Sequence, residues 1–205
     1  MFTGIITALG TITQSSGQDH IHARIACPFD PDTIAMGASI ACSGVCLTVV
    51  DKGGVAGDAW FAVDISGETI ARTVAGRWAA GTVLNLEPAL KLGDELGGHI
   101  VTGHVDGVGT IVGLCPAGDS TRVGIAAPAD LAPYIAEKGS ITVDGISLTV
   151  NDIADQADGT CHFALNIIPH TGKVTNAGEW AVGQQVNLEI DVLARYLKRM
   201  QALKG

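Results

Sequence analysis

Three features that the chain lacks limit the classes of protein to which it can belong. Basic residues are few: 12 lysines and arginines stand against 21 aspartates and glutamates, which gives a net charge of −9. Nucleic acids and anionic membrane surfaces require basic patches, so we expect neither as a partner. No apolar run approaches the ~20 residues of a membrane-spanning helix. The chain opens without a basic segment followed by an apolar core, so we also expect no secretory signal.

Cysteines are too few and too irregular for a structural framework. There are five, an odd number, and no spacing indicates zinc ligands or a set of disulfides. His99 and His104 are five residues apart without further ligand-type partners, which predicts no metal site. We leave His99 as a structural residue, and a reducing cytoplasm is the expected compartment.

Aromatic residues make up only 4% of the chain, whereas glycine occurs 27 times and 47% of the residues are hydrophobic. Frequent glycine together with valine, isoleucine and threonine is typical of many short strands joined by tight turns. The 205 residues suffice for one large domain or two of about 100.

The chain contains an internal duplication. Residues 61–87 align with residues 163–189 without a gap, and the segment around Phe2-Thr3-Gly4-Ile5 aligns with Val101-Thr102-Gly103-His104. A repeat of this length is a duplicated domain, because solenoid units span only ~20–50 residues. The junction between the halves lies near residues 93–98.

One hexad recurs in both halves: GVCLTV at residues 44–49 and GISLTV at residues 145–150. Period-two alternation places Cys46 and Thr48 on one face of a strand, and Ser147 and Thr149 on the equivalent face. Strand-like runs at 5–13, 39–50 and 83–87, and at 108–112, 140–150 and 185–190, predict a small closed barrel in each half, which leaves no open sheet edge. Short helical pieces are expected near residue 33, at 68–74 and at 130–137.

The C-terminal tail has a different pattern. After Asp191, a possible N-cap, apolar residues recur at helical spacing, with cationic residues mostly opposite. The apolar stripe is Val192, Leu193, Tyr196, Leu197, Met200 and Leu203, and the cations are Arg195, Lys198, Arg199 and Lys204. This stripe is expected either to mediate self-association or to pack on the barrels of its own chain.

The candidate functional residues each have a structural alternative. Cys46 is either a nucleophile or a small buried hydrophobe. His104 replaces Ile5 of the first half and is either a proton carrier or a structural histidine. The pairs Glu68-Thr69 and His170-Thr171 either cap a helix or contact a ligand, and Lys138 either neutralises an anion or is a solvated surface residue. Asp191 could be only a helix cap.

Taken together, these motifs resemble the riboflavin synthase alpha-chain family. The resemblance rests on MFTGII at the start, the two hexads, the run GGHIVTGHVDG at 97–107, and NLEID at 187–191. It covers essentially the whole chain and implies an all-β fold of two tandem six-stranded Greek-key barrels plus a C-terminal helix. The implied boundaries are 1–96 and 97–190 for the two lumazine-binding barrels and 191–205 for an oligomerisation helix.

The resemblance also implies a function. Two molecules of 6,7-dimethyl-8-ribityllumazine would dismutate into riboflavin and 5-amino-6-(D-ribitylamino)uracil by transfer of a four-carbon unit, with no cofactor and no metal. The protein would be a homotrimer with active sites between neighbouring subunits. Whether it sits inside a lumazine synthase capsid stays open.

Carried over position by position, the resemblance implies two ligand sites. The first would use Gly4, Ile5, Ile6, Cys46, Leu47, Thr48, Asp64, Ile65, Ser66, Gly67, Glu68 and Thr69. The second would use Gly103, His104, Val105, Lys138, Ser147, Leu148, Thr149, Ile168, Pro169, His170, Thr171, Gly172 and Lys173. The residues associated with turnover would be Phe2, Cys46, His104, Ser147, Thr149 and Asp191. Ser66-Gly67 departs from the family pattern at the rim of the first site.

Two identical substrates must play unlike parts, and the halves differ at Cys46 against Ser147, Ile5 against His104 and Ala89 against Asp191. We expect His104, Ser147 and Thr149 to handle proton transfer, while Cys46 or a water adds to the partner ring. The alternatives are a lumazine- or flavin-binding protein without catalysis and the flavin-binding barrel of a reductase, for which the duplication leaves no room for a nicotinamide domain.

Overall fold

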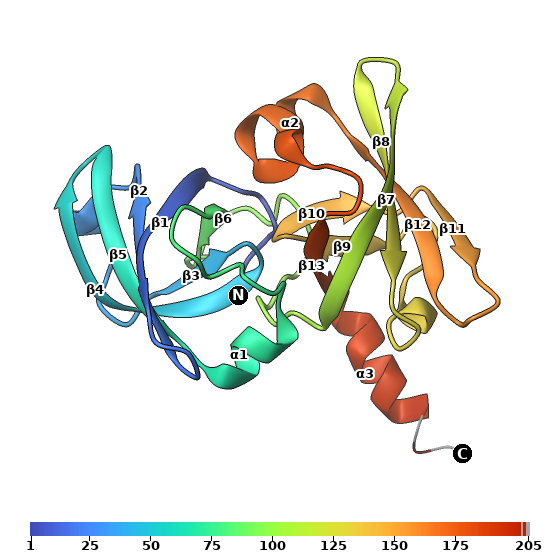
Figure 1. Ribbon diagram of the computed structural model, residues 1–205, viewed down its shortest axis with the longest axis horizontal. Helices are drawn as coiled ribbons and strands as arrows, with labels where there is room; N and C mark the ends of the chain where they lie inside the picture. Colours follow the sequence, from blue (N-terminus) through green and yellow to red (C-terminus); the bar gives the residue numbers. More distant parts are fainter. Residues whose placement is uncertain (202, 204–205) are drawn as a thin grey trace.

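The structure is a computed structural model that describes residues 1–201 and 203. In Figure 1 the first repeat occupies one side of the molecule and the second repeat the other, with the helix α3 extending from the second. Six antiparallel strands of the first repeat close into a barrel in the order β1-β2-β5-β4-β3-β6. They are β1 (Ala8–Ser16), β2 (Ile21–Cys27), β3 (Ser39–Cys42), β4 (Val45–Val55), β5 (Asp58–Ile65) and β6 (Val83–Pro88).

The second repeat forms a seven-stranded sheet in the order β10-β9-β13-β7-β8-β12-β11. Its strands are β7 (Gly107–Ala117), β8 (Ser120–Ala127), β9 (Ser140–Val143), β10 (Ile146–Thr149), β11 (Asp152–Asp155), β12 (Cys161–Ile167) and β13 (Gln185–Ile190). The order matches that of the first barrel, except that two strands, β10 and β11, replace the single β4. The expected fold class is therefore confirmed, but the closed six-stranded barrel expected for this half is wrong: its seven strands form a sheet that stays open between β10 and β11.

The interruption has a local cause. In the first repeat the register shifts between Val49 and Asp51, a β-bulge that bends the continuous β4. At the equivalent point of the second repeat, Val150 donates its N–H to Gly139 and Asn151 donates to Ala164. In the first repeat Val49 also donates to Ala38, but it pairs with Val63 of β5 as well. The ladder between β11 and β12 begins only at Asp152, so one bent strand is divided into two.

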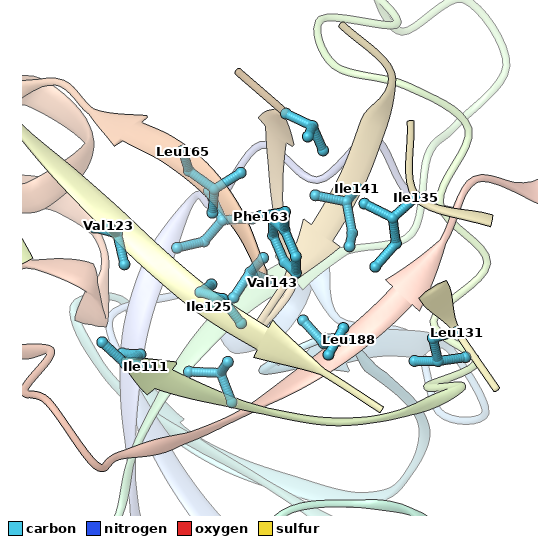
Figure 2. Packing of buried hydrophobic residues seen from close by; sticks show 14 of the residues in the cluster. Ile111, Val123, Ile125, Leu131, Ile135, Ile141, Val143, Phe163, Leu165 and Leu188 are labelled. Carbon is cyan, nitrogen blue, oxygen red and sulfur yellow. The ribbon is translucent and has the colours of Figure 1, made fainter. Parts of the chain in front are cut away.

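Each repeat has its own apolar core, and Figure 2 shows the core of the second one. Phe163 lies at its centre, and Ile125, Val143 and Leu188 pack around it from different strands. The first repeat has the equivalent cluster around Phe61. Two separate cores support the duplicated-domain interpretation of the sequence.

Two of the expected strand runs are in fact hairpins. Residues 39–50 turn at Ser43-Gly44, and residues 140–150 turn at Asp144-Gly145. The expected short helical pieces are present as η1 (Pro31–Thr33), α1 (Gly67–Arg72) and η2 (Ala132–Tyr134). The second repeat adds α2 (Pro169–Val174) and η3 (Asn176–Glu179).

The tail forms the expected helix, α3 (Val192–Gln201). Asp191 Oδ1 accepts the N–H of Leu193 at 2.9 Å, which is the cap that the sequence predicts. Most of the apolar stripe is exposed on α3 or just beyond it, at Leu193, Tyr196, Leu197, Met200 and Leu203. The part of the predicted 191–205 segment at residues 202, 204 and 205, including the expected cation Lys204, lies outside the described residues.

The two repeats meet through a buried polar network that has approximate two-fold symmetry. Asn85 Nδ2 donates to the carbonyl oxygen of Asp144, and Asn187 Nδ2 donates to the carbonyl oxygen of Ser43. Gly44 and Gly145 touch at the centre: a Cβ added at Gly44 would lie 2.8 Å from the Gly145 nitrogen. Side chains are therefore excluded from this contact.

The network is symmetric in position but not in charge. Ser43 Oγ accepts the Asn85 N–H, and Asp144 Oδ1 accepts the Asn187 N–H in the equivalent bond. Of the two acceptors only Asp144 carries a charge, and its Oδ1 lies 2.9 Å from Nη2 of Arg77. Both side chains of this pair are buried, so the junction contains an ion pair that the sequence pattern did not indicate.

Candidate functional site

Two short segments cross between the repeats and reach the hexads. Phe2 and Val101 exchange backbone hydrogen bonds of 2.8 and 3.0 Å, which holds the segments side by side. Beyond this point, Gly4 accepts the N–H of Ser147 and Gly103 accepts the N–H of Cys46, both at 2.8 Å. Each segment therefore lies on the hexad of the other repeat.

The glycines are required at these crossings. Gly4 and Gly103 have φ angles of 75° and 78°, which side chains disfavour. An added Cβ at Gly4 would lie 2.6 Å from Ser147 Cβ, and one at Gly103 would lie 2.6 Å from Cys46 Cβ. The close approach brings the ends of these segments next to the thiol and the hydroxyl.

This exchange corrects the grouping of site residues expected from the sequence. Gly4 and Ile5 were expected with Cys46, and Gly103 and His104 with Ser147. The structure pairs them the other way round within one chain. Thus the imidazole of His104 belongs with the thiol of Cys46.

The first cavity, as we call it, has a volume of about 380 Å³ and opens beside Cys46. Cys46 is half-buried and His104 is exposed on its wall. The other walls come from α1 and from the start of α3. The lining residues are Val45, Cys46, Glu68, Thr69, Arg72, Thr73, Gly103, His104, Val105, Asp106 and Arg195.

The residues at the start of α1, on the rim of the first cavity, form a helix cap and an ion pair. Ser66, not Glu68 or Thr69, is the N-cap, since its Oγ accepts the Thr69 N–H at 3.3 Å. Glu68 instead pairs with Arg72 one turn later, at 2.8 Å. The departure at Ser66 thus supplies the cap and leaves Glu68 and Thr69 facing the cavity.

Two buried carboxylates hold the crossing segments in place. Glu87 accepts the N–H groups of Thr3 and Gly4 at 2.7 and 2.9 Å. Glu189 accepts those of Thr102 and Gly103 at the same distances. Burial raises the pKa of both carboxyl groups, and these donors act in the opposite direction. In the sequence, Glu87 and Glu189 recur at equivalent positions of the two repeats. This recurrence alone did not show that they bind the crossing segments.

The second site, as we call it, contains a hydroxyl bonded to a histidine. Ser147 Oγ lies 2.7 Å from His99 Nδ1, and Thr142 Oγ1 lies 3.2 Å from His99 Nε2. Burial lowers the pKa of His99, against which the charge of Asp191 acts. At neutral pH the ring is therefore uncharged and can accept a proton. His99, set aside as structural in the sequence, is the site residue that was missed.

Other predicted residues take different positions. Phe2 is fully buried against Ala41 and Val101, and Cys46 packs against the same cluster. Phe2 therefore helps to hold the Cys46 side chain in place. Leu47 and Ile65 point into the first core, which leaves only their backbone for a ligand. Asp64 Oδ1 is 2.7 Å from His22 Nδ1 on the neighbouring strand.

The remaining predicted residues lie at or near the surface. All five of the following are exposed or partly exposed: Thr48 and Thr149 on strands, Lys138 in a turn, Gly67 at the start of α1, and Ile6 in the segment before β1. Val105 is partly buried and lines the first cavity, while Leu148 packs against the second core. The segment on and before α2 is exposed or half-buried at Ile168, Pro169, His170, Thr171, Gly172 and Lys173.

The two sites differ in chemistry although their backbones are equivalent. The first combines a thiol with the exposed imidazole of His104, whereas the second combines a hydroxyl with the buried imidazole of His99 and places Ile5 at the position of His104. The hydroxyl–imidazole contact of the second site can activate a nucleophile or move a proton, and the thiol and imidazole that line the first cavity can both act on one ligand bound there. Over residues 1–201 and 203, no cluster of three metal-ligating side chains occurs and no helix is long and apolar enough to cross a membrane.

Comparisons with known proteins agree with the duplication. The family profile of the lumazine binding domain matches twice, at residues 3–89 and 102–191. Riboflavin synthase of Brucella abortus is 47% identical over 204 residues, covering 98% of both chains. Riboflavin synthase of Mycobacterium bovis is 45% identical over 207 residues, covering all of both chains. Among solved structures, LumP complexed with riboflavin matches with a TM-score of 0.78 and 28% identity, over 93% of this chain and 99% of that one.

Proposed function

The chain belongs to the riboflavin synthase family of lumazine-binding-domain proteins, and from this premise we propose how its two unlike sites share the work. The activity of the family is the dismutation of two 6,7-dimethyl-8-ribityllumazine molecules into riboflavin and 5-amino-6-(D-ribitylamino)uracil. One molecule gives up a four-carbon unit and the other receives it. Each subunit accordingly offers two sites for the same substrate, one at each hexad.

The observation that carries the division of work is the 2.7 Å contact between Ser147 and His99. An uncharged His99 with its proton on Nε2 donates to Thr142 and accepts the Ser147 proton at Nδ1. The second site therefore serves proton transfer at the acidic methyl group of its lumazine. In the first cavity, Cys46 or a water beside His104 adds to the ring of the other lumazine.

Orientation supplies a further part of the rate. Holding two reacting rings face to face can be worth ~7–11 kcal/mol, because a reaction between two molecules becomes one within a complex. The two sites of one chain are separated by the junction of the repeats, so we propose that the rings meet across an interface: the first cavity of one subunit faces the second site of a neighbour.

The exposed stripe on α3 supports this assembly. Leu193, Tyr196, Leu197 and Met200 are each at least 55% exposed, an unusual amount for one face of one helix. The alternative expected from the sequence, packing of the stripe on its own barrels, is not what the structure has. We propose that the helices of neighbouring subunits cover one another's stripes in a homotrimer.

Five free cysteines fit the expected reducing compartment.

We expect Leu197→Glu to dissociate the assembly, because it places a charge in the middle of the apolar contact. Light scattering at micromolar protein should give the mass of one subunit for the variant and of three for the parent. Val55→Glu makes the same change at another exposed aliphatic residue and should stay assembled. A parent of dimeric mass, or an assembled Leu197→Glu variant, would contradict the proposed trimer contact.

Conversion of the substrate tests the function directly. The protein is incubated with 6,7-dimethyl-8-ribityllumazine alone, and riboflavin fluorescence is expected to appear without any added cofactor. Cys46→Ser and His104→Gln should each slow turnover by roughly 10²-fold or more if these groups act on the reacting ring. Near-normal turnover in both variants would remove the role assigned to the first cavity.

A binding protein without catalysis is the second candidate, favoured by the likeness to LumP, whose structures hold riboflavin, flavin mononucleotide or the ribityllumazine. Tight binding of the lumazine with no riboflavin formed would support this candidate. The curated relatives at 45–47% identity favour the enzyme.

A further inference from the structure

Helix α3 turns its cationic side, not its apolar side, toward its own chain. Arg195 reaches the first cavity, and the Lys198 ammonium lies 4.6 Å from the centre of the Tyr134 ring in the second repeat. Only Ala194 of α3 packs against the second core. The helix is therefore docked in cis by two polar anchors while its stripe remains exposed.

Arg195 binds the wall that carries His104. Its Nη2 donates to Asp106 Oδ2 at 2.9 Å and to the carbonyl oxygen of His104 at 3.3 Å. The same Asp106 oxygen accepts the N–H of Ile190, the last residue of β13. One guanidinium thus connects the helix, the cavity wall and the strand that precedes the helix.

The other repeat has no equivalent of this contact. Thr7 occupies the position of Asp106, and its hydroxyl donates to the carbonyl oxygen of Leu86. The segment that follows β6 has no helix and brings no guanidinium to Ile5. The pair of Arg195 and Asp106 is therefore a further difference between the two sites, and its guanidinium comes from the C-terminal helix, which the first repeat lacks.

We propose that Arg195 is a positioning residue of the first cavity: it fixes the His104–Asp106 wall, so that the helix that assembles the protein also shapes one of its two ligand sites. This inference rests on the proposed function, since it concerns how one lumazine is held. Arg195 lies away from the exposed stripe, so its effect on the cavity is separable from assembly.

The electrostatics of Asp106 provide an independent readout. Burial raises the pKa of its carboxyl group, whereas the Ile190 N–H and the charges of Arg195, Lys198 and His104 lower it. Removing the guanidinium removes one of the stabilising charges, so the pKa of Asp106 rises further. Protonation then releases the wall at a higher pH than in the parent protein.

The test compares Arg195→Met with Lys198→Met, which removes a cation from the same helix away from the cavity, and with Arg195→Lys. Titration with the lumazine should resolve two sites per subunit. In Arg195→Met, one site is expected to weaken roughly tenfold, as for loss of a charge-assisted hydrogen bond, with the other unchanged. The pH at which acidification abolishes lumazine binding at that site should also move upward, and Arg195→Lys should restore part of both effects. Lys198→Met should bind the lumazine at both sites as tightly as the parent at neutral pH, with a smaller upward shift of the acid loss, because the Lys198 charge also lowers the pKa of Asp106.

The outcomes separate the inference from the function on which it rests. Conversion by the parent with an unchanged Arg195→Met variant would overturn the inference alone. Equal weakening of both sites, or a lowered subunit number by light scattering, would show that Arg195 serves assembly and would also overturn it. Failure of the parent to bind or convert the lumazine would instead overturn the proposed function.

Discussion

Replacing Asp144 with alanine is expected to lower the free energy of unfolding by about 3–5 kcal/mol, because the buried Arg77 guanidinium would lose its counter-ion. Asn187 N–H and Asn176 Nδ2 would lose their acceptor as well. For a chain of this size the loss corresponds to a fall in melting temperature of roughly 6–20 °C. Calorimetry at one fixed protein concentration would measure it, since assembly also contributes to apparent stability.

The first repeat offers a matched control for this change. Ser43 has φ of 45° and Asp144 has φ of 47°, so Ser43→Ala carries the same backbone strain and removes one neutral acceptor. It should cost only about 1 kcal/mol. Combining Asp144→Ser with Arg77→Met removes both charges and should recover most of the stability, as replacements of buried ion pairs often do. A double variant no more stable than Asp144→Ala would show that charge burial is not the cause.

His99→Gln is expected to reduce kcat by about 10²–10³-fold, with little change in stability, because it removes the proton acceptor of Ser147. Burial holds the pKa of His99 below its ordinary value, so the ring is protonated only on acidification. The parent should therefore lose activity at acid pH as His99 becomes charged, and His99→Gln should lack this step. Steady-state kinetics between pH 5 and pH 9 would show it.

A double-mutant cycle tests whether His99 acts through Ser147. Ser147→Ala, His99→Gln and the combination should lose kcat to about the same extent, because removal of either residue disables the same pair. His20→Gln changes an exposed histidine and serves as the control. Additive losses, or an unchanged acidic limb in His99→Gln, would contradict the proposed pair.

Much of the fold could be predicted from the sequence, because a duplication of about 100 residues with alternating apolar positions leaves few architectures. The C-terminal helix, its cap at Asp191 and the hexad strands were also predictable. The divided strand at Val150 and Asn151 was not, since apolar alternation is the same in a bent strand and an interrupted one. The hairpin turns at Ser43 and Asp144 were hidden within apolar runs.

It was easier to predict which residues belong to the two sites than to predict which of them lie together in one site. Residues 2–6 and 101–105 have the same pattern whether they pair within a repeat or across repeats, and only the contacts of Gly4 and Gly103 decide it. His99 lies ahead of the aligned segments, so the repeat comparison gave it no counterpart. Arg195 was on the polar side of a helix, where solvent exposure was the ordinary expectation.

The crossing of the two segments has a consequence for how such a chain could arise. Because each hexad is completed by the start of the opposite half, a half-length polypeptide would have to find a second copy before either site was whole. Its activity would then fall with dilution. Joining two copies in tandem makes that encounter intramolecular, at an effective concentration that dilution does not change. Once joined, the halves are free to diverge, and cysteine and serine can occupy what began as one position.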